Sequence, residues 1–227
     1  VVDAASEFRY RNPILKKDDI FIVISQSGET ADTLEALRIA KKCGAKVIAI
    51  TNTVGSSVSR EADRVIYTWA GPEIAVASTK AYTTQLMCLY LLAIKMGEVR
   101  GTIEKDDYLK LLKQLEEIPE KAKQIVENQP VIQKFASEQF NKEKIFYIGR
   151  LFDSASSMEC ALKLKEVSYM HSEAFAAGEL KHGPIALVDN STLVVALATE
   201  PALYEKIASN ILEVKARGAA TLVITQD

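Results

Sequence analysis

The sequence predicts an α/β protein in which a parallel sheet lies between two layers of helices, a flavodoxin-like three-layer sandwich present in two tandem copies. The first observation is an internal repeat. A shift of 174 positions places residues 22–25 on 196–199 and residues 47–51 on 221–225, with no gap between the matches. The matched strands are continuous apolar runs, which is typical of parallel strands covered on both faces. In each copy a helix-length connection ends in glycine, and such a connection indicates a parallel crossover.

The repeat also predicts the domain organisation. The first copy should occupy residues 1–100, a charged helical linker residues 101–141, and the second copy residues 142–227. The parallel strands are expected at 20–24, 47–51, 145–149, 193–197 and 221–225. The opening strand and helix of the second copy have no counterpart before Val1, and the chain ends where the first copy continues. We therefore expect both ends to be truncated relative to two complete copies.

The turn at residues 25–30, Ser-Gln-Ser-Gly-Glu-Thr, joins the apolar strand 20–24 to an amphipathic helix at 31–43. Backbone N–H groups at the start of a helix have no partner within the helix, and the helix dipole favours an anion there. The turn lacks the lysine of a Walker A loop and two of the three glycines of a dinucleotide fingerprint. The sequence therefore predicts a site for a phosphate monoester, such as a sugar phosphate.

The side chains of this turn support the same prediction. Ser25, Ser27 and Thr30 supply neutral hydroxyl donors, and Gly28 allows the backbone to approach a ligand closely. The alternative is an ordinary helix cap formed by Ser27 or Thr30, which would need no ligand.

The corresponding turn of the second copy is different. Residues 199–202 read Thr-Glu-Pro-Ala in place of Ser-Gln-Ser-Gly. A glutamate and a proline are unsuited to an anion site, so this turn is expected to be structural.

Between the two turns, the apolar segment 81–96 predicts a buried core helix, because it is shorter than the roughly 20 residues of a membrane span. The linker should be broken at Pro119 and Pro130. The second copy should open with a strand at 144–150 and a long helix starting near Ser154.

Composition excludes several classes of protein. A formal net charge of −2 over 227 residues gives no basic footprint for nucleic acid. The three cysteines, Cys43, Cys88 and Cys160, are widely spaced and form no metal or redox motif. With only two histidines and no signal peptide, we expect no metal, no cofactor, no membrane association and a cytoplasmic location.

A second chemical cluster lies in the other copy. Lys163 and Glu166 stand at helical spacing i, i+3, and His182 follows after a stretch of small residues at 174–178, expected to form a loop that approaches a ligand closely. A carboxylate can move a proton between C1 and C2 of a sugar, and a histidine can assist ring opening near neutral pH. Taken singly, the pair could be a surface ion pair and the histidine a turn residue.

Four motifs along the chain resemble the sugar-isomerase (SIS) half of the glutamine–fructose-6-phosphate aminotransferase (isomerising) family, the glucosamine-6-phosphate synthases. They lie at residues 25–30, 76–80, 164–166 and 179–184. The first is shared by many SIS proteins, whereas the other three in this order are close to specific for the synthases. The resemblance runs along nearly the whole chain.

The resemblance implies a role for each residue of these motifs. The residues that it assigns to the phosphate of fructose 6-phosphate are Ser25, Gln26, Ser27 and Thr30. Those that it assigns to the sugar are Val76 and Ser78. Glu166 would carry the proton in isomerisation with Lys163 beside it, and His182 would assist ring opening from the neighbouring subunit of a homodimer.

The implied activity is conversion of fructose 6-phosphate into glucosamine 6-phosphate with ammonia from glutamine in the full-length enzyme. The family's glutaminase domain, a serine from a turn before Val1 and a Schiff-base lysine beyond Asp227 have no counterpart here, so the chain alone is expected to be inactive. One alternative is another SIS sugar-phosphate isomerase or deaminase, which would share the turn at 25–30 without this second cluster. The other is a non-catalytic sugar-phosphate-binding SIS module, which would need no general base.

Overall fold

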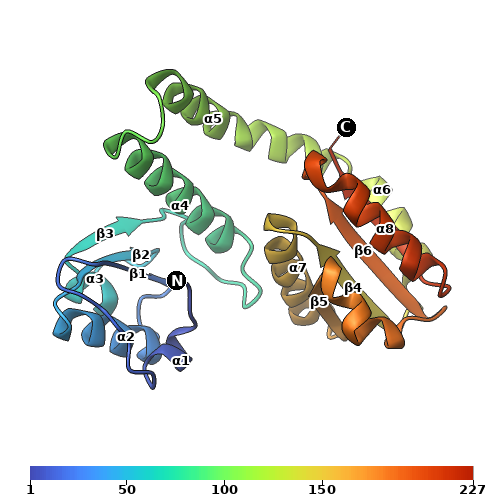
Figure 1. Cartoon of the computed structure of the whole chain (residues 1–227), viewed down its shortest axis with the longest axis horizontal. Coiled ribbons are helices and arrows are strands. Elements are labelled where there is room, and N and C mark those ends of the chain that lie inside the picture. The colour runs from blue at the N-terminus through green and yellow to red at the C-terminus, as the bar shows by residue number, and fades with distance from the viewer. Residues whose placement is uncertain (227) are drawn as a thin grey trace. The chain divides into compact units, whose positions relative to one another are not determined.

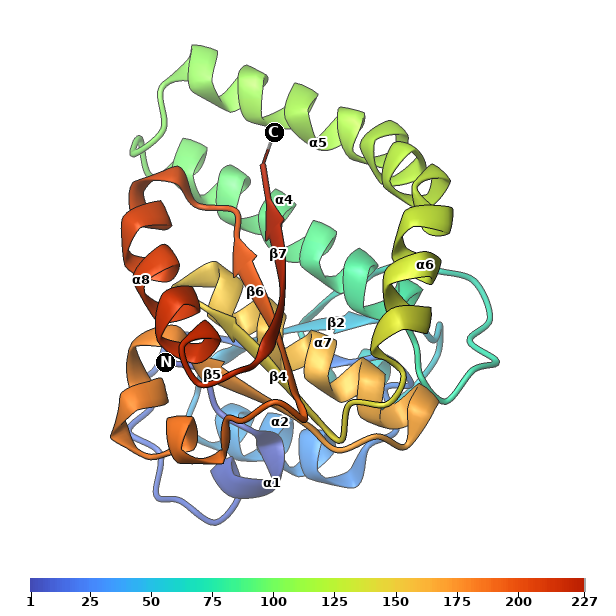
Figure 2. The same cartoon turned by 90° about the vertical axis from the view of Figure 1, so that its right-hand side faces the viewer.

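The computed structural model describes residues 1–226, which form two compact units divided between Lys121 and Ala122 (Figures 1 and 2). Each unit is built on its own parallel sheet. The sheet of the first unit has the strand order β1-β2-β3, and that of the second has the order β5-β4-β6-β7.

The first unit alternates strands and helices in sequence order, as the βαβ pattern predicts. Its elements are α1 (Ala5–Phe8), β1 (Ile20–Ser25), α2 (Ala31–Lys42), β2 (Lys46–Thr51), α3 (Ser57–Glu61), β3 (Arg64–Tyr67) and α4 (Lys80–Val99), and most of α5 (Lys105–Glu127) follows. One face of the sheet packs on α2 and α3 around the buried residues Val23, Leu37 and Val58. The carboxyl ends of β1 and β2 meet in register at Ser25 and Thr51, where the turn at residues 25–30 begins.

The second unit covers both faces of its sheet. Its elements are α6 (Gln129–Gln139), β4 (Lys144–Gly149), α7 (Phe152–Ser168), β5 (Ser172–Ala176), η1 (Ala177–His182), η2 (Pro184–Leu187), β6 (Thr192–Ala198), η3 (Pro201–Leu203), α8 (Tyr204–Lys215) and β7 (Ala220–Thr225). One core joins β4 and β6 to α8 and η1, with Phe146 and Val194 buried in it. The opposite core joins Leu193 and Val195 of β6 to Leu164 of α7 and Phe135 of α6.

These observations confirm the predicted fold class. All five predicted strands are present within one residue of their predicted ends, and all pair in parallel. Gly44 and Gly218 follow the two repeated helices with φ of 87° and 91°, a left-handed conformation that favours glycine.

Two local predictions are wrong. The small-residue stretch at 174–178 is not a close-approach loop, because Ser172–Ala176 forms the edge strand β5 and Ala177 and Leu180 after it are fully buried. Pro119 does not break the linker but lies inside α5. That helix has no buried residue, so water can bond the carbonyl that a proline leaves unpaired one turn earlier.

The prediction of a buried core helix at 81–96 is correct for one face of α4 only. Ala81, Cys88 and Ile94 are buried, whereas Tyr90 and Leu91 remain about half exposed. Among residues 1–226, no helix combines the length and the apolar character that a membrane crossing needs.

Candidate functional site

The turn at residues 25–30 lies at the carboxyl end of β1 and leads directly into α2. Two of its N–H groups are already used: Gly28 donates to Ser25 Oγ at 3.1 Å, and Glu29 donates to Ser27 Oγ at 3.3 Å. The N–H groups of Ser27 and Thr30 donate to no other residue of the described chain. Together with the first turn of α2, they form an open set of donors suited to an anion.

Gly28 is required by the geometry of this turn. Its φ is 66°, which a side chain adopts only with strain. A Cβ at this position would lie 2.1 Å from Ser56 Oγ and 2.9 Å from Thr51 Oγ1. Glycine therefore allows the turn to pack against the chain that follows β2.

Residues after β2 brace the turn from the side. The carbonyl of Gln26 accepts a hydrogen bond from Asn52 N at 3.0 Å, and the carbonyl of Gly28 accepts one from Val58 N at 2.9 Å. Hydrogen bonds from Ser57, one of them 2.8 Å long from its backbone N–H, lower the pKa of Glu29. Sequence reasoning missed these bracing residues. The signal was the hydroxyl-rich run at 51–57, which follows a strand whose carboxyl end lies beside that of β1.

The predicted sugar-contacting residues lie in the loop between β3 and α4. Val76 is almost fully exposed. The hydroxyl of Ser78 donates to the carboxylate of Glu73 and accepts from Ala81 N at 3.2 Å, and the first of these contacts lowers the pKa of Glu73. Lys80 Nζ closes the loop by donating to the carbonyl of Pro72 at 2.5 Å.

In the second unit, Lys163 lies between two carboxylates of α7. Its Nζ is 2.5 Å from Glu166 Oε2 and 3.6 Å from Glu159 Oε1. The hydrogen bond to Glu166, with the charge of Glu159, raises the pKa of Lys163. Lys163 therefore keeps its positive charge beside Glu166 at neutral pH.

His182 is exposed at the end of η1, before Gly183. Within the described residues its side chain makes no hydrogen bond or ion pair. The structure thus places the turn, Val76 and Ser78 in the first unit, and Lys163, Glu166 and His182 in the second.

The turn after β6 differs from the turn after β1 in what occupies its donors. Thr199 donates from its backbone N to Asp153 Oδ2 at 2.8 Å and from its hydroxyl to Asp153 Oδ1 at 2.5 Å. Asp153 stands in the first turn of α7 and is buried. A carboxylate of the protein itself therefore occupies both donors of Thr199, the residue opposite Ser25 in the repeat.

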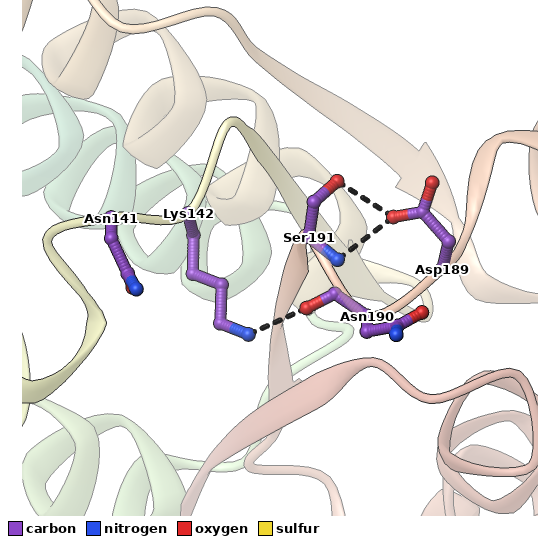
Figure 3. Close-up of a pocket in the computed structure, with 5 residues that line it drawn as sticks. All are labelled: Asn141, Lys142, Asp189, Asn190 and Ser191. Atoms are coloured by element: carbon purple, nitrogen blue, oxygen red, sulfur yellow. Dashed lines mark hydrogen bonds between the residues drawn. The ribbon is translucent and has the colours of Figure 1, made fainter.

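A polar hollow at the opposite, amino-terminal edge of the second sheet carries no comparable chemistry (Figure 3). Figure 3 shows that its lining groups bond one another: Lys142 donates to the Asn190 carbonyl, and Ser191 donates twice to Asp189. Ligands of parallel α/β sheets bind at the carboxyl ends of the strands instead. Residues 1–226 contain no group of three or more histidine, cysteine, aspartate or glutamate side chains that could hold a metal ion.

Comparison with known proteins gives consistent matches. The SIS domain family matches residues 1–95 and 140–227. A glutamine–fructose-6-phosphate aminotransferase (isomerising) of Caldanaerobacter subterraneus subsp. tengcongensis is 61% identical over 96% of this chain and 36% of its own length. The enzyme of the same name from Clostridium tetani is 57% identical over 98% of this chain and 37% of its own length. The chain thus spans little more than a third of these curated relatives.

Solved structures show the same relationship. The C-terminal domain of glucosamine-fructose-6-phosphate aminotransferase from Francisella tularensis matches with a TM-score of 0.96 and 39% identity, over 99% of this chain and 64% of that one. A glucosamine-6-phosphate deaminase from Thermotoga maritima matches with a TM-score of 0.80 and 25% identity, over 97% of this chain and 65% of that one. These matches confirm the resemblance that the four motifs predict. Since the family match covers most of the sequence and both units, the chain belongs to the SIS domain family.

Proposed function

We propose that this chain is the isomerase part of a glutamine–fructose-6-phosphate aminotransferase (isomerising). It binds fructose 6-phosphate and, in the full-length enzyme, converts it into glucosamine 6-phosphate with ammonia from glutamine. The observation that carries the proposal is the turn at 25–30, whose open N–H groups at Ser27 and Thr30 lie at the start of α2 beside hydroxyls that bond within the turn. The name shared by relatives at 57–61% identity supports this substrate over other phosphate monoesters.

In this proposal the substrate phosphate binds at the turn through neutral donors. Ser27 and Thr30 offer hydroxyl and N–H groups, whereas Ser25, which is buried, holds the Gly28 N–H in place beneath them. Gln26 contributes at the side of the turn. Val76 and Ser78, in the loop before α4, contact the sugar.

The proton transfer is assigned to Glu166. Ammonia first replaces the C2 oxygen of the open-chain ketose, which leaves as water, and gives the C2 imine. The Glu166 carboxylate then takes the proton from C1 and returns it to C2, while the electrons of the C1–H bond move through the enolamine and the O1 proton passes to nitrogen. The ammonium of Lys163, 2.5 Å from Glu166, supplies positive charge where negative charge develops. This pairing supports a catalytic role for a lysine that would otherwise be a surface ion-pair partner.

We assign ring opening to His182, acting at the site of a neighbouring subunit in a homodimer. Its exposure and the lack of a side-chain partner within residues 1–226 support this assignment, since its imidazole is available to a neighbouring subunit. We further propose that residues 101–141 link the two copies and that the enzyme is cytoplasmic, with its three cysteines reduced.

The test measures which sugar phosphates raise the melting temperature of the chain and whether the full-length enzyme forms glucosamine 6-phosphate. Fructose 6-phosphate and glucosamine 6-phosphate should stabilise the chain, and glucose 1-phosphate should do so much less. Product should form from fructose 6-phosphate only when glutamine or ammonia is present. Release of ammonia from glucosamine 6-phosphate, with no synthesis from glutamine, would instead identify a deaminase like the 25%-identical structural match.

A further inference from the structure

The chain that leaves β3 is held to the phosphate-binding turn by one side chain. Asn52, the first residue after β2, donates its backbone N–H to the carbonyl of Gln26 at 3.0 Å and so extends the β1–β2 ladder by one bond. Its side chain reaches the other way, toward residues 68–71. Figure 1 shows this segment at the start of the long loop from β3 to α4.

The side chain of Asn52 uses both ends of its amide. Its Nδ2 donates to the carbonyl of Gly71 at 2.7 Å. Its Oδ1 accepts from the backbone N–H of Ala70 at 2.9 Å and from the hydroxyl of Thr68 at 3.0 Å. Only a short side chain with a donor and an acceptor can make this set of bonds.

The segment held by Asn52 has a strained backbone. Trp69 has φ of 53° and Gly71 has φ of 72°, both in the left-handed region. For a bulky, exposed residue such as Trp69 this conformation costs about 1 kcal/mol or more, so surrounding bonds must maintain it. Such strain is typical of segments whose path is set by function.

We propose that Asn52 is a positioning residue that fixes the sugar-contacting loop relative to the phosphate-binding turn. It touches neither the phosphate nor the sugar. It sets the distance between the turn at Gln26 and the loop that carries Val76 and Ser78, so that both ends of one substrate are bound together. This inference rests on the proposed function, because it takes from that proposal the ligand that spans the two segments.

The test compares two ligands on the chain as it exists, inorganic phosphate and fructose 6-phosphate, by NMR titration or calorimetry. Asn52→Ala keeps the backbone bond to Gln26 and removes only the bonds to residues 68–71. Its affinity for fructose 6-phosphate should fall by roughly tenfold, the effect of losing two or three net hydrogen bonds, while that for phosphate changes less than about twofold. The neighbouring Thr53→Ala, which alters an exposed residue 3.5 Å from the same Gln26 carbonyl, should change neither affinity.

Thr68→Val is the second variant, and it tests the same inference if Asn52→Ala fails to fold. It removes one of the three side-chain bonds and should lower the affinity for fructose 6-phosphate alone by roughly two- to fivefold. Equal losses for both ligands would mean that Asn52 only supports the turn, and no loss for either would mean that it positions nothing. Both results overturn the inference. A wild-type chain that binds phosphate but shows no preference for the sugar phosphate overturns the proposed function, and the inference with it.

Discussion

The turns after β1 and β6 occupy the same place in the internal repeat, but they differ in whether their hydrogen-bond donors already have partners within the protein. In the first turn, the N–H groups of Ser27 and Thr30 remain open. In the second, the backbone and hydroxyl of Thr199 are both bonded to the carboxylate of Asp153. The comparison indicates that the first turn keeps donors open for an anion from outside the protein. In the second turn a carboxylate of the protein already occupies the donors of Thr199, the residue opposite Ser25, and Pro201, opposite Ser27, has no N–H group.

This difference accompanies a division of proposed roles between the copies. The first copy offers the phosphate-binding turn and the sugar-contacting loop, and the second offers Lys163, Glu166 and His182. A duplicated fold can divide binding and catalysis between its copies, because both copies need the same sheet to fold but their turns can differ. The predictions below test the division, from the largest expected effect to the smallest.

Glu166→Gln should separate chemistry from binding most strongly. The amide keeps the size of the side chain but cannot take a proton, so turnover in the full-length enzyme should fall by about 10²–10⁴. Binding of fructose 6-phosphate should change little, because the phosphate turn is in the other copy. Exchange of the C1 proton with solvent deuterium measures the step directly. Glu159→Gln, which alters the other carboxylate beside Lys163, is the matched control and should retain most of the exchange.

Gly28→Ala in the first turn should lower the free energy of unfolding far more than an alanine-to-glycine change at the matching position of the second turn. The added Cβ meets Ser56 at a positive φ, so we expect a loss of roughly 2–4 kcal/mol in the free energy of unfolding. The repeat places Ala202 opposite Gly28, and Ala202→Gly should cost less than about 1 kcal/mol. Urea denaturation measures both, and similar costs would contradict the assigned geometry.

Replacing Ser27 and Thr30 with alanine should weaken fructose 6-phosphate binding by roughly 1–3 kcal/mol, the net value of hydrogen bonds to a charged group. Thr199→Ala, at the position opposite Ser25 in the second copy, is the control and should leave binding unaffected. Calorimetry distinguishes the two cases. If the double variant binds like the wild type, the phosphate lies elsewhere.

Asp153→Ala should open the second turn. Made in the Ser27→Ala, Thr30→Ala background, where the first turn is weakened, it should destabilise the fold by roughly 1–3 kcal/mol. Inorganic phosphate should then recover about 0.4 kcal/mol at a concentration equal to its Kd. A thermal-shift series in phosphate measures this recovery. If phosphate stabilises the parent double variant by the same amount, or does not stabilise the Asp153 variant, then Asp153 is not the group that occupies the second turn.

The smallest expected effect is the contribution of Asp189 to stability, which should be lost at acidic pH. Hydrogen bonds from Lys144 and then from Ser191 hold the pKa of Asp189 well below its usual range. A lowered folded-state pKa contributes stability above the usual Asp value of about 3.9 and loses it as the pH falls toward the folded-state value. The melting-temperature difference between wild type and Asp189→Asn should therefore shrink below about pH 4. Asn190→Ala, in the same turn without a titratable group, should show a difference that does not depend on pH in this way.

Much of the fold could be predicted from local patterns. The strands β1, β2, β4, β6 and β7 carry polar residues only at or near their ends and are otherwise continuous apolar runs, so a covered parallel sheet was the consistent solution. The strand β5 was missed because Ser172–Ala176 is a short edge strand without a continuous apolar run. Its pairing with β4 comes from the sheet and has no matching signal in its own composition.

The sequence by itself determined the position of the proposed anion-binding turn, because the donors, the glycine and the helix start are adjacent in the chain. Tertiary structure decided what surrounds those donors. Asp153 reaches Thr199 across 46 residues, and Ser56 reaches Gly28 across 28, and neither residue is marked by its neighbours in sequence. A hydrogen bond between distant residues depends on the strand order, which brings carboxyl ends together at one edge of the sheet. Whether a donor is open or occupied is therefore a property of the folded sheet, although the donor itself can be predicted from the sequence.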